Sequence, residues 1–462
     1  MGHERIVIFG ASGGALKVAD TLTNLGIGYE YFVDNDSKKW GTSVRGKIVK
    51  APQTLIETDE RILIASDYQS EIEEQLKEWN ILERLILKEE CILQYFDKRS
   101  KSLRLHQHNS VHTVIIELAD AGICLGGIET WTLMVTRDLK KRVHNVKLWI
   151  REQEQSVPDD LTEIVQTFDY RYDRYAESIE DTMQEIAKNL PCTIISNWQS
   201  QVMIAAILVR RKFPDKIKII SVVHNDKIAL YRRQSFLEPD TDFIFCVSQK
   251  IRDTFLNHYG VSADKLIYKE SPVRIPEGEK QYRIDRNQPI RLGYAARISK
   301  YQKRADLLVD LIHLLDERKV NYYMEIAGTG SYYEQFRERI RLSNGNIILL
   351  GQVAREQMQD FWNRQDVFIS VSDFEGTSIS MLEAMAAGVV PVVTRVSGVD
   401  EFVEDGVNGY SSQPGDISKL VDAIVFLEQN RDLISSYGVR CRDIVRKKCN
   451  EDEYISVLED KL

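Results

Sequence analysis

The 462-residue sequence has no run of apolar residues long enough to cross a bilayer, and its N-terminus leads almost directly into a short apolar segment. Both features argue against a membrane-spanning helix and against a secretory signal. Cysteine is scarce as well: six are present, and none has Cys-x-x-Cys spacing. We therefore expect reduced thiols in a cytoplasmic protein.

The sequence also has no excess of positive charge, because its formal net charge is -9. A surface that follows nucleic-acid phosphates needs such an excess, so we expect no nucleic-acid partner. Two local basic stretches, residues 137–142 and 210–218, leave two alternatives open. Each is either a solvated face or a patch that contacts anionic lipid at the inner membrane face, beside a lipid-linked acceptor.

What the sequence does contain is a segment with two glutamates, Phe374 to Gly388. A short apolar run before it predicts a buried strand, and Ser380 to Ala387 predicts a helix that ends at Gly388. Glu375 then lies at the carboxyl end of a strand and Glu383 lies in the helix, where both can face one crevice. Carboxylates that accept hydrogen bonds from vicinal hydroxyls, beside loop amides that meet a diphosphate, are typical of nucleotide-sugar recognition.

A structural alternative exists for the same glutamates. Ser380 and Glu383 have the spacing of a capping box, and Glu375 could be a solvated loop residue. A second cluster favours the functional interpretation: Arg297 and Lys303 follow another apolar strand, at residues 291–296. Two cations on such a loop neutralise the charge that develops on a departing diphosphate.

Together these segments resemble the retaining glycosyltransferases of family 4, over about three quarters of the chain from Thr113 onward. The resemblance implies the GT-B fold, in which two Rossmann-like domains face each other. The matching residues are Gly126-Gly127-Ile128-Glu129, His224, Arg297, Lys303, Gly328-Thr329-Gly330, Gly351, Glu375 and Glu383-Ala384-Met385-Ala386-Ala387-Gly388.

The resemblance implies roles for these residues. Arg297 and Lys303 would hold the donor diphosphate, Glu383 the ribose and Glu375 the hydroxyls of the donor sugar. The acceptor hydroxyl would enter on the face that the diphosphate leaves, and the leaving phosphate would take its proton. Main-chain amides near the phosphates would come from Gly376, Thr377, Ser378 and Ile379. Thr377-Ser378 and Ser271-Pro272 depart from the common family pattern, which bears on the identity of the sugar.

Three further positions belong to the predicted site. His224 ends an apolar strand; it is either a satisfied core residue or, as the resemblance implies, a donor of a hydrogen bond to developing charge. The Gly126-Gly127 loop is either a plain turn or a loop that closes over the cleft. Gly328 is included among the donor-binding positions on the resemblance.

The first hundred residues predict a separate small α/β unit. A glycine-rich turn, which includes Gly10 and Gly13, is followed about twenty residues later by Asp34, the layout of a nucleotide site in which amides meet phosphate and a carboxylate meets ribose. The unit resembles the N-terminal nucleotide-sugar-binding domain of sialic-acid-type acyltransferases, without their hexapeptide-repeat part. A purely structural or partner-docking role is the alternative.

No metal is expected. Asp34-Asn35-Asp36 and Asp240-Thr241-Asp242 imitate an Asp-x-Asp metal motif, but neither lies near the donor cluster in sequence. The pair His106 and His108, in a predicted linker, has no carboxylate or cysteine beside it.

The predicted domain map has four parts: a small Rossmann-like domain (1–105), a GT-B acceptor-side domain (110–277), a GT-B donor-side domain (289–440) and a C-terminal helix packed back across the lobes (441–462). Residues 277–288 would form the hinge.

The predicted function is transfer of a hexose or hexose derivative from a nucleotide diphosphate sugar, with UDP as the nucleotide, to a surface-polysaccharide, lipid-linked or protein acceptor in a bacterium. No cofactor is expected. The alternative is a non-catalytic nucleotide-sugar-binding sensor or scaffold.

Overall fold

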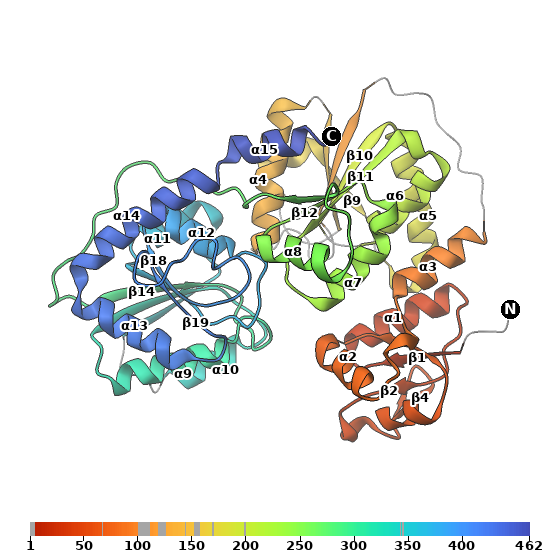
Figure 1. The fold of residues 1–462 in the computed structure, drawn as a ribbon, viewed down its shortest axis with the longest axis horizontal. Coiled ribbons are helices and arrows are strands. Elements are labelled where there is room, and N and C mark those ends of the chain that lie inside the picture. The colour runs from red at the N-terminus through yellow and green to blue at the C-terminus, as the bar shows by residue number, and fades with distance from the viewer. Residues whose placement is uncertain are drawn as a thin grey trace.

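The computed structural model describes residues 5–66, 68–99, 111–118, 126–143, 145–151, 158–168, 171–197, 200–341, 343 and 346–462. Three sheets follow one another along the chain, each covered by helices, and they define a first, a middle and a last unit (Figure 1). The expected α/β class is confirmed. The linker with His106 and His108 lies outside the described residues.

The first unit has a six-stranded sheet in the order β3-β4-β2-β1-β5-β6, parallel except for the β3–β4 pair. From β1 the chain builds one side of the sheet and then crosses to β5, so a topological switch point lies between β1 and β5. Its elements are β1 (Ile6–Phe9), α1 (Gly13–Asn24), β2 (Phe32–Val33), β3 (Ser43–Val44), β4 (Lys47–Lys50), β5 (Arg61–Ile64), α2 (Gln69–Glu78), β6 (Leu85–Ile86) and α3 (Lys88–Asp97).

The middle unit has a parallel seven-stranded sheet in the order β13-β12-β11-β10-β7-β8-β9, with its switch point between β7 and β10. Its elements are β7 (Thr113–Leu118), α4 (Gly127–Arg142), β8 (Val146–Arg151), β9 (Val165–Phe168), α5 (Tyr175–Lys188), β10 (Cys192–Ser196), α6 (Gln201–Lys212), β11 (Ile217–Val223), α7 (Ile228–Leu237), β12 (Phe243–Cys246), α8 (Gln249–His258) and β13 (Leu266–Tyr268).

The last unit has a parallel six-stranded sheet in the order β16-β15-β14-β17-β18-β19, with its switch point between β14 and β17. Open α/β sheets bind ligands at such points, beyond the carboxyl ends of the strands. Its elements are β14 (Ile290–Ala295), α9 (Ala305–Glu317), β15 (Tyr322–Ala327), α10 (Tyr333–Ile340), β16 (Asn346–Gly351), α11 (Met358–Asn363), β17 (Val367–Ser370), α12 (Ile379–Ala386), β18 (Val390–Thr394), β19 (Tyr410–Ser412) and α13 (Ile417–Gln429).

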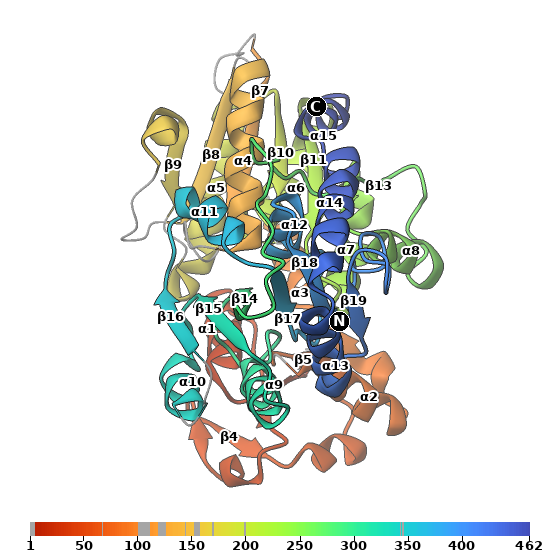
Figure 2. The same cartoon turned by 90° about the vertical axis from the view of Figure 1, so that its left-hand side faces the viewer.

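The C-terminal part consists of two helices, α14 (Arg431–Lys448) and α15 (Glu451–Glu459). Helix α14 begins ten residues before the expected boundary at 441 and runs along the last unit, and α15 lies against the middle unit (Figures 1 and 2). Tyr454 of α15 is buried and accepts a hydrogen bond from the Trp131 indole at 3.1 Å. The chain end is held there too, because Lys218 donates to the Leu462 carbonyl at 2.6 Å.

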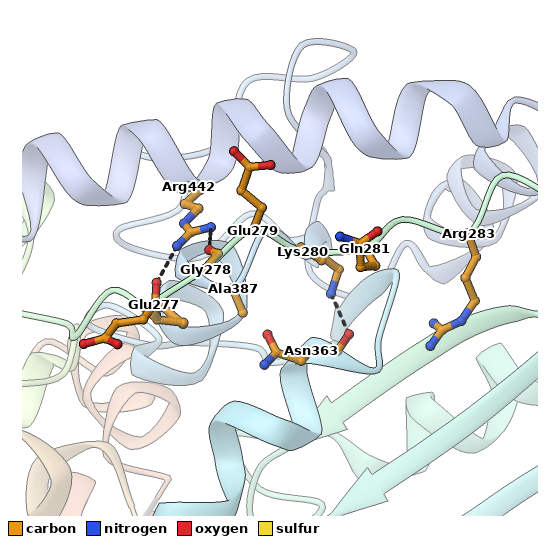
Figure 3. Close-up of a pocket in the computed structure, with 10 residues that line it drawn as sticks. Glu277, Gly278, Glu279, Lys280, Gln281, Arg283, Asn363, Ala387 and Arg442 are labelled. Carbon is orange, nitrogen blue, oxygen red and sulfur yellow. Dashed lines mark hydrogen bonds between the residues drawn. The ribbon is translucent and has the colours of Figure 1, made fainter.

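The segment predicted as a hinge is fixed to the last unit. Lys280 donates to the Trp362 carbonyl at 3.0 Å, and Arg283 donates to the Arg364 carbonyl at 2.9 Å. Arg442 of α14 donates to the carbonyls of Pro276 and Gly278 (Figure 3). A cavity of about 270 Å³ lies along this segment. Residues 276–283 therefore belong structurally to the last unit.

The first unit shares a hydrophobic core with the middle unit. Leu25, Ile92, Leu93 and Phe96 are buried in one cluster with helices α5 and α6. Arg232 of α7 also pairs with Glu73 of α2, with 2.8 Å between Nε and Oε2, and the Glu73 side chain is 6% exposed. Burial of shared apolar surface makes the first and middle units one packed body.

Candidate functional site

The loops after β14 and β17 flank the switch point of the last unit, and they are joined by an ion pair. Lys303 Nζ lies 2.5 Å from Glu375 Oε1, and the two side chains are 19% and 8% exposed. Gln302 donates from Nε2 to Glu375 Oε2 at 3.2 Å. Both carboxylate oxygens of Glu375 are thus held by side chains that lie 72 and 73 positions earlier in the chain. Two of the four predicted catalytic residues are in direct contact.

The backbone of the Lys303 loop is unusual. Gln302 and Arg304 both have positive φ, 66° and 47°, a region that side-chain-bearing residues rarely adopt. Such positions cost of the order of 1–3 kcal/mol each and persist where surrounding contacts hold them. Here the Asp373 amide donates to the Gln302 carbonyl at 2.8 Å, and Arg304 forms two hydrogen bonds of 2.9–3.0 Å with the Asp373 carboxylate.

The His224 loop of the middle unit meets the Glu375 loop directly. Asn225 and Gly376 form an antiparallel β-bridge, and the Asp226 amide donates to the Glu375 carbonyl at 3.3 Å. A Cβ on Gly376 would lie 2.1 Å from the His224 carbonyl oxygen, so only glycine allows this approach. The middle and last units therefore meet at the predicted site.

The protonation of His224 follows from its partners. Asn197 Nδ2 donates to the Glu117 carbonyl and to the Thr132 hydroxyl, so its Oδ1 is the acceptor that faces His224 Nε2 at 2.8 Å. This arrangement selects the tautomer with hydrogen on Nε2 and leaves Nδ1 as an acceptor. Burial lowers the pKa of His224 to about 3, so the ring is neutral. Donation to a ligand from the ring, as predicted, would require His224 to exchange the Asn197 partner.

Helix α12 carries Glu383, and its N-terminus is not capped by the Ser380–Glu383 capping box that the sequence left open as an alternative. Ser378 is the N-cap, and its hydroxyl accepts from the Met381 amide at 3.2 Å. Glu383 is therefore not the partner of Ser380 in a capping box. The helix ends before Gly388, whose φ of 75° suits glycine. Burial raises the pKa of Glu383 to about 7, and the Arg355 guanidinium partly opposes this shift.

The predicted glycine loop lies against the start of α12. Gly126 is the N-cap of α4, and a Cβ on Gly127 would lie 3.3 Å from Ile379 Cγ1. Burial raises the pKa of Glu129 in the same turn, and the positive charge of Arg297 opposes this shift. Arg297 itself is exposed. The N-terminus of α4 thus lies against the N-terminus of α12 at the interface between the units. Arg297 is close enough to Glu129 in this region for its charge to act on the carboxyl.

The remaining donor-side positions support neighbouring backbone. Gly328 has a φ of 140°, and a Cβ there would lie 2.0 Å from the Ala296 carbonyl oxygen, so the glycine allows the 328–330 turn to pack on the Arg297 loop. The Thr377 hydroxyl donates to the Val247 carbonyl at 2.7 Å. The hydroxyls of Thr377 and Ser378 thus form hydrogen bonds within the protein. Binding of the donor phosphates by the main-chain amides of these two residues stays a prediction.

The glycine turn of the first unit lies apart from this site. A cavity of about 210 Å³ opens at the switch point between β1 and β5, and α7 of the middle unit forms its opposite wall. Gly10, Gly13 and Asp34 are not among its lining residues, which include Ser12, Gly14, Ser66, Lys88, Ala229 and Arg233. Nucleotide binding by the first unit stays a prediction. The residues that line its cavity differ from Gly10, Gly13 and Asp34, which were predicted to bind the ligand.

Asp34 has a local structural role. Its carboxylate accepts hydrogen bonds from the amides of Ala11 and Asp36 at 2.8 and 2.9 Å and from Lys39 Nζ at 2.9 Å. Burial alone would raise the pKa of this carboxyl, but the hydrogen bonds outweigh it and lower the pKa. The contact with ribose that was predicted for Asp34 would have to displace main-chain partners.

No group of three or more metal-ligating side chains occurs among the described residues. Asp242 pairs with Arg210, and Asp240 pairs with Arg211 at 2.7 Å. Arg137 and Arg142, in the other basic stretch, pair with Asp160 and Asp452 at 2.5 Å each. These ion pairs fit the solvated-face interpretation, while membrane contact stays a prediction. None of the described helices has the length and hydropathy to span a bilayer.

Sequence reasoning missed several residues of the site. Arg355 lies beside Glu383 and donates to the Thr130 carbonyl of α4 at 3.3 Å. Tyr294 on β14 is 2% exposed, and burial and the charge of Glu375 raise the pKa of its hydroxyl. Only the apolar run that predicts β14 could have signalled Tyr294, and nothing near Arg355 in the sequence signals a role.

The fold and the joined loops define a glycosyltransferase of the GT-B type, and comparison with family models agrees. Residues 125–268 match the model Glycosyltransferase Family 4, and residues 289–430 match Glycosyl transferases group 1. The chain belongs to glycosyltransferase family 4. Residues 2–87 match a model called C2185-like, N-terminal. The predicted resemblance of this unit to acyltransferases is not supported by these matches.

Curated relatives are similar at low identity. N-acetyl-alpha-D-glucosaminyl L-malate synthase of Bacillus anthracis is 21% identical over 310 residues, 63% of this chain and 79% of that protein. Poly(ribitol-phosphate) alpha-N-acetylglucosaminyltransferase of Staphylococcus aureus is 29% identical over 162 residues, 34% of this chain and 31% of that protein.

Solved structures show the same fold. Anabaena HepE in complex with UDP and glucose has a TM-score of 0.64 at 15% identity, covering 75% of this chain and 98% of that one. A Staphylococcus aureus TarM mutant in complex with fondaparinux, alpha-GlcNAc-glycerol and UDP has a TM-score of 0.52 at 14% identity, covering 99% of each chain.

Proposed function

We propose that the chain is a retaining, metal-independent hexosyltransferase that uses a UDP-sugar donor and a surface-glycan, lipid-linked or protein acceptor. The observation that carries the proposal is the junction of the two units: the Lys303–Glu375 pair of the last unit adjoins the His224 loop through the Asn225–Gly376 bridge. The pair lies at the switch point of the last unit, where α/β sheets bind ligands, and this supports Glu375 as the group for sugar hydroxyls and Lys303 as a cation for phosphate.

In the proposed reaction the bond between sugar C1 and the diphosphate oxygen breaks, and a bond forms between C1 and the acceptor oxygen. The acceptor proton passes to the departing diphosphate, and UDP leaves. Arg297 and Lys303 stabilise the charge that develops on the diphosphate. Glu375 holds the sugar hydroxyls and Glu383 the ribose. Neutral His224 lies at the junction as a polar neighbour of the sugar.

The relatives support the donor and the outcome. HepE is described in complex with UDP-glucose, and the pneumococcal O-GlcNAc transferase GtfA in complex with UDP and GlcNAc. The names of both curated relatives above describe α-N-acetylglucosaminyl products. Transfer of an α-linked sugar from a UDP-α-sugar retains configuration, which is consistent with the proposal.

The test is a panel of nucleotide sugars. We expect thermal stabilisation by one UDP-sugar or a few, followed by slow UDP release when that sugar is incubated with the protein. Glu375→Ala and Arg297→Ala should abolish the release, while Glu404→Ala and Arg318→Ala, exposed changes in the last unit, should not. Tight donor binding with no turnover across acceptors, and no hydrolysis, would favour the sensor alternative.

A further inference from the structure

A cluster of aromatic rings joins all three units beside the Lys303–Glu375 pair. Tyr301 and Phe374, both in the last unit, have ring centroids 5.4 Å apart. Tyr68 of the first unit packs edge-on against Tyr301 at 6.2 Å, and Lys227 of the middle unit lies 4.8 Å from the Tyr301 ring centre and 4.6 Å from that of Phe374. We name these four residues the junction cluster.

The cluster is next to the reacting groups in sequence and in space. Tyr301 precedes Lys303 by two residues, and Phe374 immediately precedes Glu375. Lys227 is three residues beyond His224 and is the N-cap of α7. Each ring thus belongs to the same loop as one partner of the ion pair.

The Lys303 loop depends on such outside contacts because of its backbone. Gln302 and Arg304 are held at positive φ on either side of Lys303. Strained residues relax when the contacts that hold them are removed. On the Asp373 side the loop is held by hydrogen bonds, and on the side of the first unit it is held by Tyr301 against Tyr68.

Tyr68 is carried by the body that opposes the last unit. It lies between β5 and α2, and α2 is fixed to α7 by the Glu73–Arg232 pair. The first and middle units also share the core that contains Leu25 and Ile92. Closure of two domains around a ligand is a common motion of enzymes with a cleft.

A role in stability alone does not account for the contact. Tyr68 is 62% exposed and Tyr301 is 38% exposed. Tyr68 is the N-cap residue of α2, but its side chain makes no capping hydrogen bond. Substitutions of exposed side chains that lie outside cores and ion pairs and cap no helix change stability little. The packing of Tyr68 can thus be removed without loss of the fold, which separates a positioning effect from unfolding.

We propose that the first unit forms part of the donor site, with Tyr68 as the positioning residue that holds Tyr301, and through it Lys303, in place for the donor diphosphate. The inference deepens the proposed function and rests on it. It gives the first unit a task that needs no ligand of its own.

The test measures the affinity of the full chain for UDP and for uridine by calorimetry, with thermal unfolding in parallel, for Tyr68→Ala, Tyr68→Phe and Ile48→Ala. Ile48 is a matched control because it is 49% exposed and lies on β4. In the sheet order, β4 lies toward one edge and β5, which precedes Tyr68, lies toward the other. Loss of an edge-on aromatic pair predicts UDP binding roughly three- to tenfold weaker in Tyr68→Ala. We expect unchanged uridine binding, an unchanged melting temperature, and near wild-type behaviour of Tyr68→Phe and Ile48→Ala.

A double-mutant cycle sharpens the assignment. If Tyr68 acts through Tyr301, Tyr68→Ala should have no further effect on UDP affinity in a Tyr301→Ala background. Additive effects of the two changes, or equal UDP affinity of wild type and Tyr68→Ala, would overturn the inference and leave the proposed function standing. A wild-type protein that binds no nucleotide or nucleotide sugar would instead refute the proposed function, and the inference with it.

Discussion

The first and last units place an acidic residue after a strand of a parallel sheet, yet they use it differently. Asp34 accepts hydrogen bonds from the amides of Ala11 and Asp36 and from Lys39, all within its own unit. Glu375 is held by the side chains of Lys303 and Gln302, which come from a different loop. Main-chain amides in a packed turn cannot leave, whereas side chains can rotate toward a ligand.

A glycine turn followed by an acidic residue does not by itself define a ligand site. The carboxylate of Asp34 completes its own fold, and its lowered pKa reflects those bonds. In the proposed function, sugar hydroxyls would replace the side-chain partners of Glu375, and Lys303 would turn to the donor phosphate. An acidic residue after a strand can therefore be fixed within its own turn, as Asp34 is, or be held by side chains of another loop, as Glu375 is.

The largest effect is expected for Glu375→Gln. The change keeps the shape but removes the charge, so hydrogen bonds to the sugar weaken and Lys303 loses its partner. At roughly 1.5–3 kcal/mol for each charged hydrogen bond, loss of two predicts a fall in UDP release of about a hundredfold or more. Initial rates on the UDP-sugar chosen by the panel measure it, with Glu404→Gln as the control. A fall of less than threefold would place Glu375 outside the reaction.

A smaller effect is expected from pH, through Glu383. Its pKa is raised to about 7, so the free protein holds the carboxyl protonated below that value, and only the ionised form accepts hydrogen bonds from both ribose hydroxyls. Uridine affinity should therefore rise with pH, by up to about tenfold per unit below 7, and level off above it. Uridine is the probe because it lacks a titrating phosphate.

The control for this pH effect is Glu383→Gln, which should flatten the profile. His224 does not contribute, because its pKa of about 3 keeps it neutral across the range. The same raised pKa predicts that the Glu383 contribution to stability falls as pH rises between 4.5 and 7, since the folded state holds a proton that the unfolded state has lost. A profile in Glu383→Gln as steep as in wild type would contradict the assignment.

Asp34→Asn should change stability and leave turnover intact. Loss of charged hydrogen bonds to amides predicts a cost of about 1–3 kcal/mol, read as a lower melting temperature than that of Asp59→Asn, which changes an exposed carboxylate elsewhere in the same unit. The Asp34 pKa is lowered, so its contribution is complete above about 3.8 and declines as pH falls through the folded value. The difference between variant and wild type should shrink on acidification. If Asp34→Asn lowered UDP release at a temperature where the variant is fully folded, Asp34 would also act in the reaction, and the difference from Glu375 would not hold.

The smallest effect is expected on removal of metal. In the proposed reaction Arg297 and Lys303 supply the positive charge at the diphosphate, so UDP release should be unchanged after treatment with EDTA. Activity that disappears on chelation and returns with manganese would show that a cation is missing from the proposed chemistry.

Much of the fold follows from local sequence, because buried parallel strands are short apolar runs bounded by turn residues. The short apolar segment close to the N-terminus forms β1, and the helix predicted at Ser380 to Ala387 differs from α12 by one residue at each end. The boundary expected at 441 falls inside a helix, because α14 follows α13 directly after Asn430 and runs from Arg431 to Lys448.

The candidate site was only partly predictable. Glu375 and Lys303 are recognisable because each follows a strand, and neighbouring parallel strands end at one edge. Arg355, Asn197 and Tyr68 come from other elements, so only tertiary packing, within the middle unit for Asn197 and between units for Arg355 and Tyr68, brings them to their partners. The positive φ of Gln302 is equally invisible, since no glycine or asparagine marks it.

The central claim is that different residues contact the ribose, the diphosphate and the sugar of the donor. The most direct test is calorimetric titration of uridine, UDP and the selected UDP-sugar into three variants. Glu383→Gln should weaken all three ligands, Arg297→Met only UDP and the UDP-sugar, and Glu375→Gln mainly the UDP-sugar, each by about tenfold or more. Equal weakening of all three ligands by every variant, or none by any, would contradict the account.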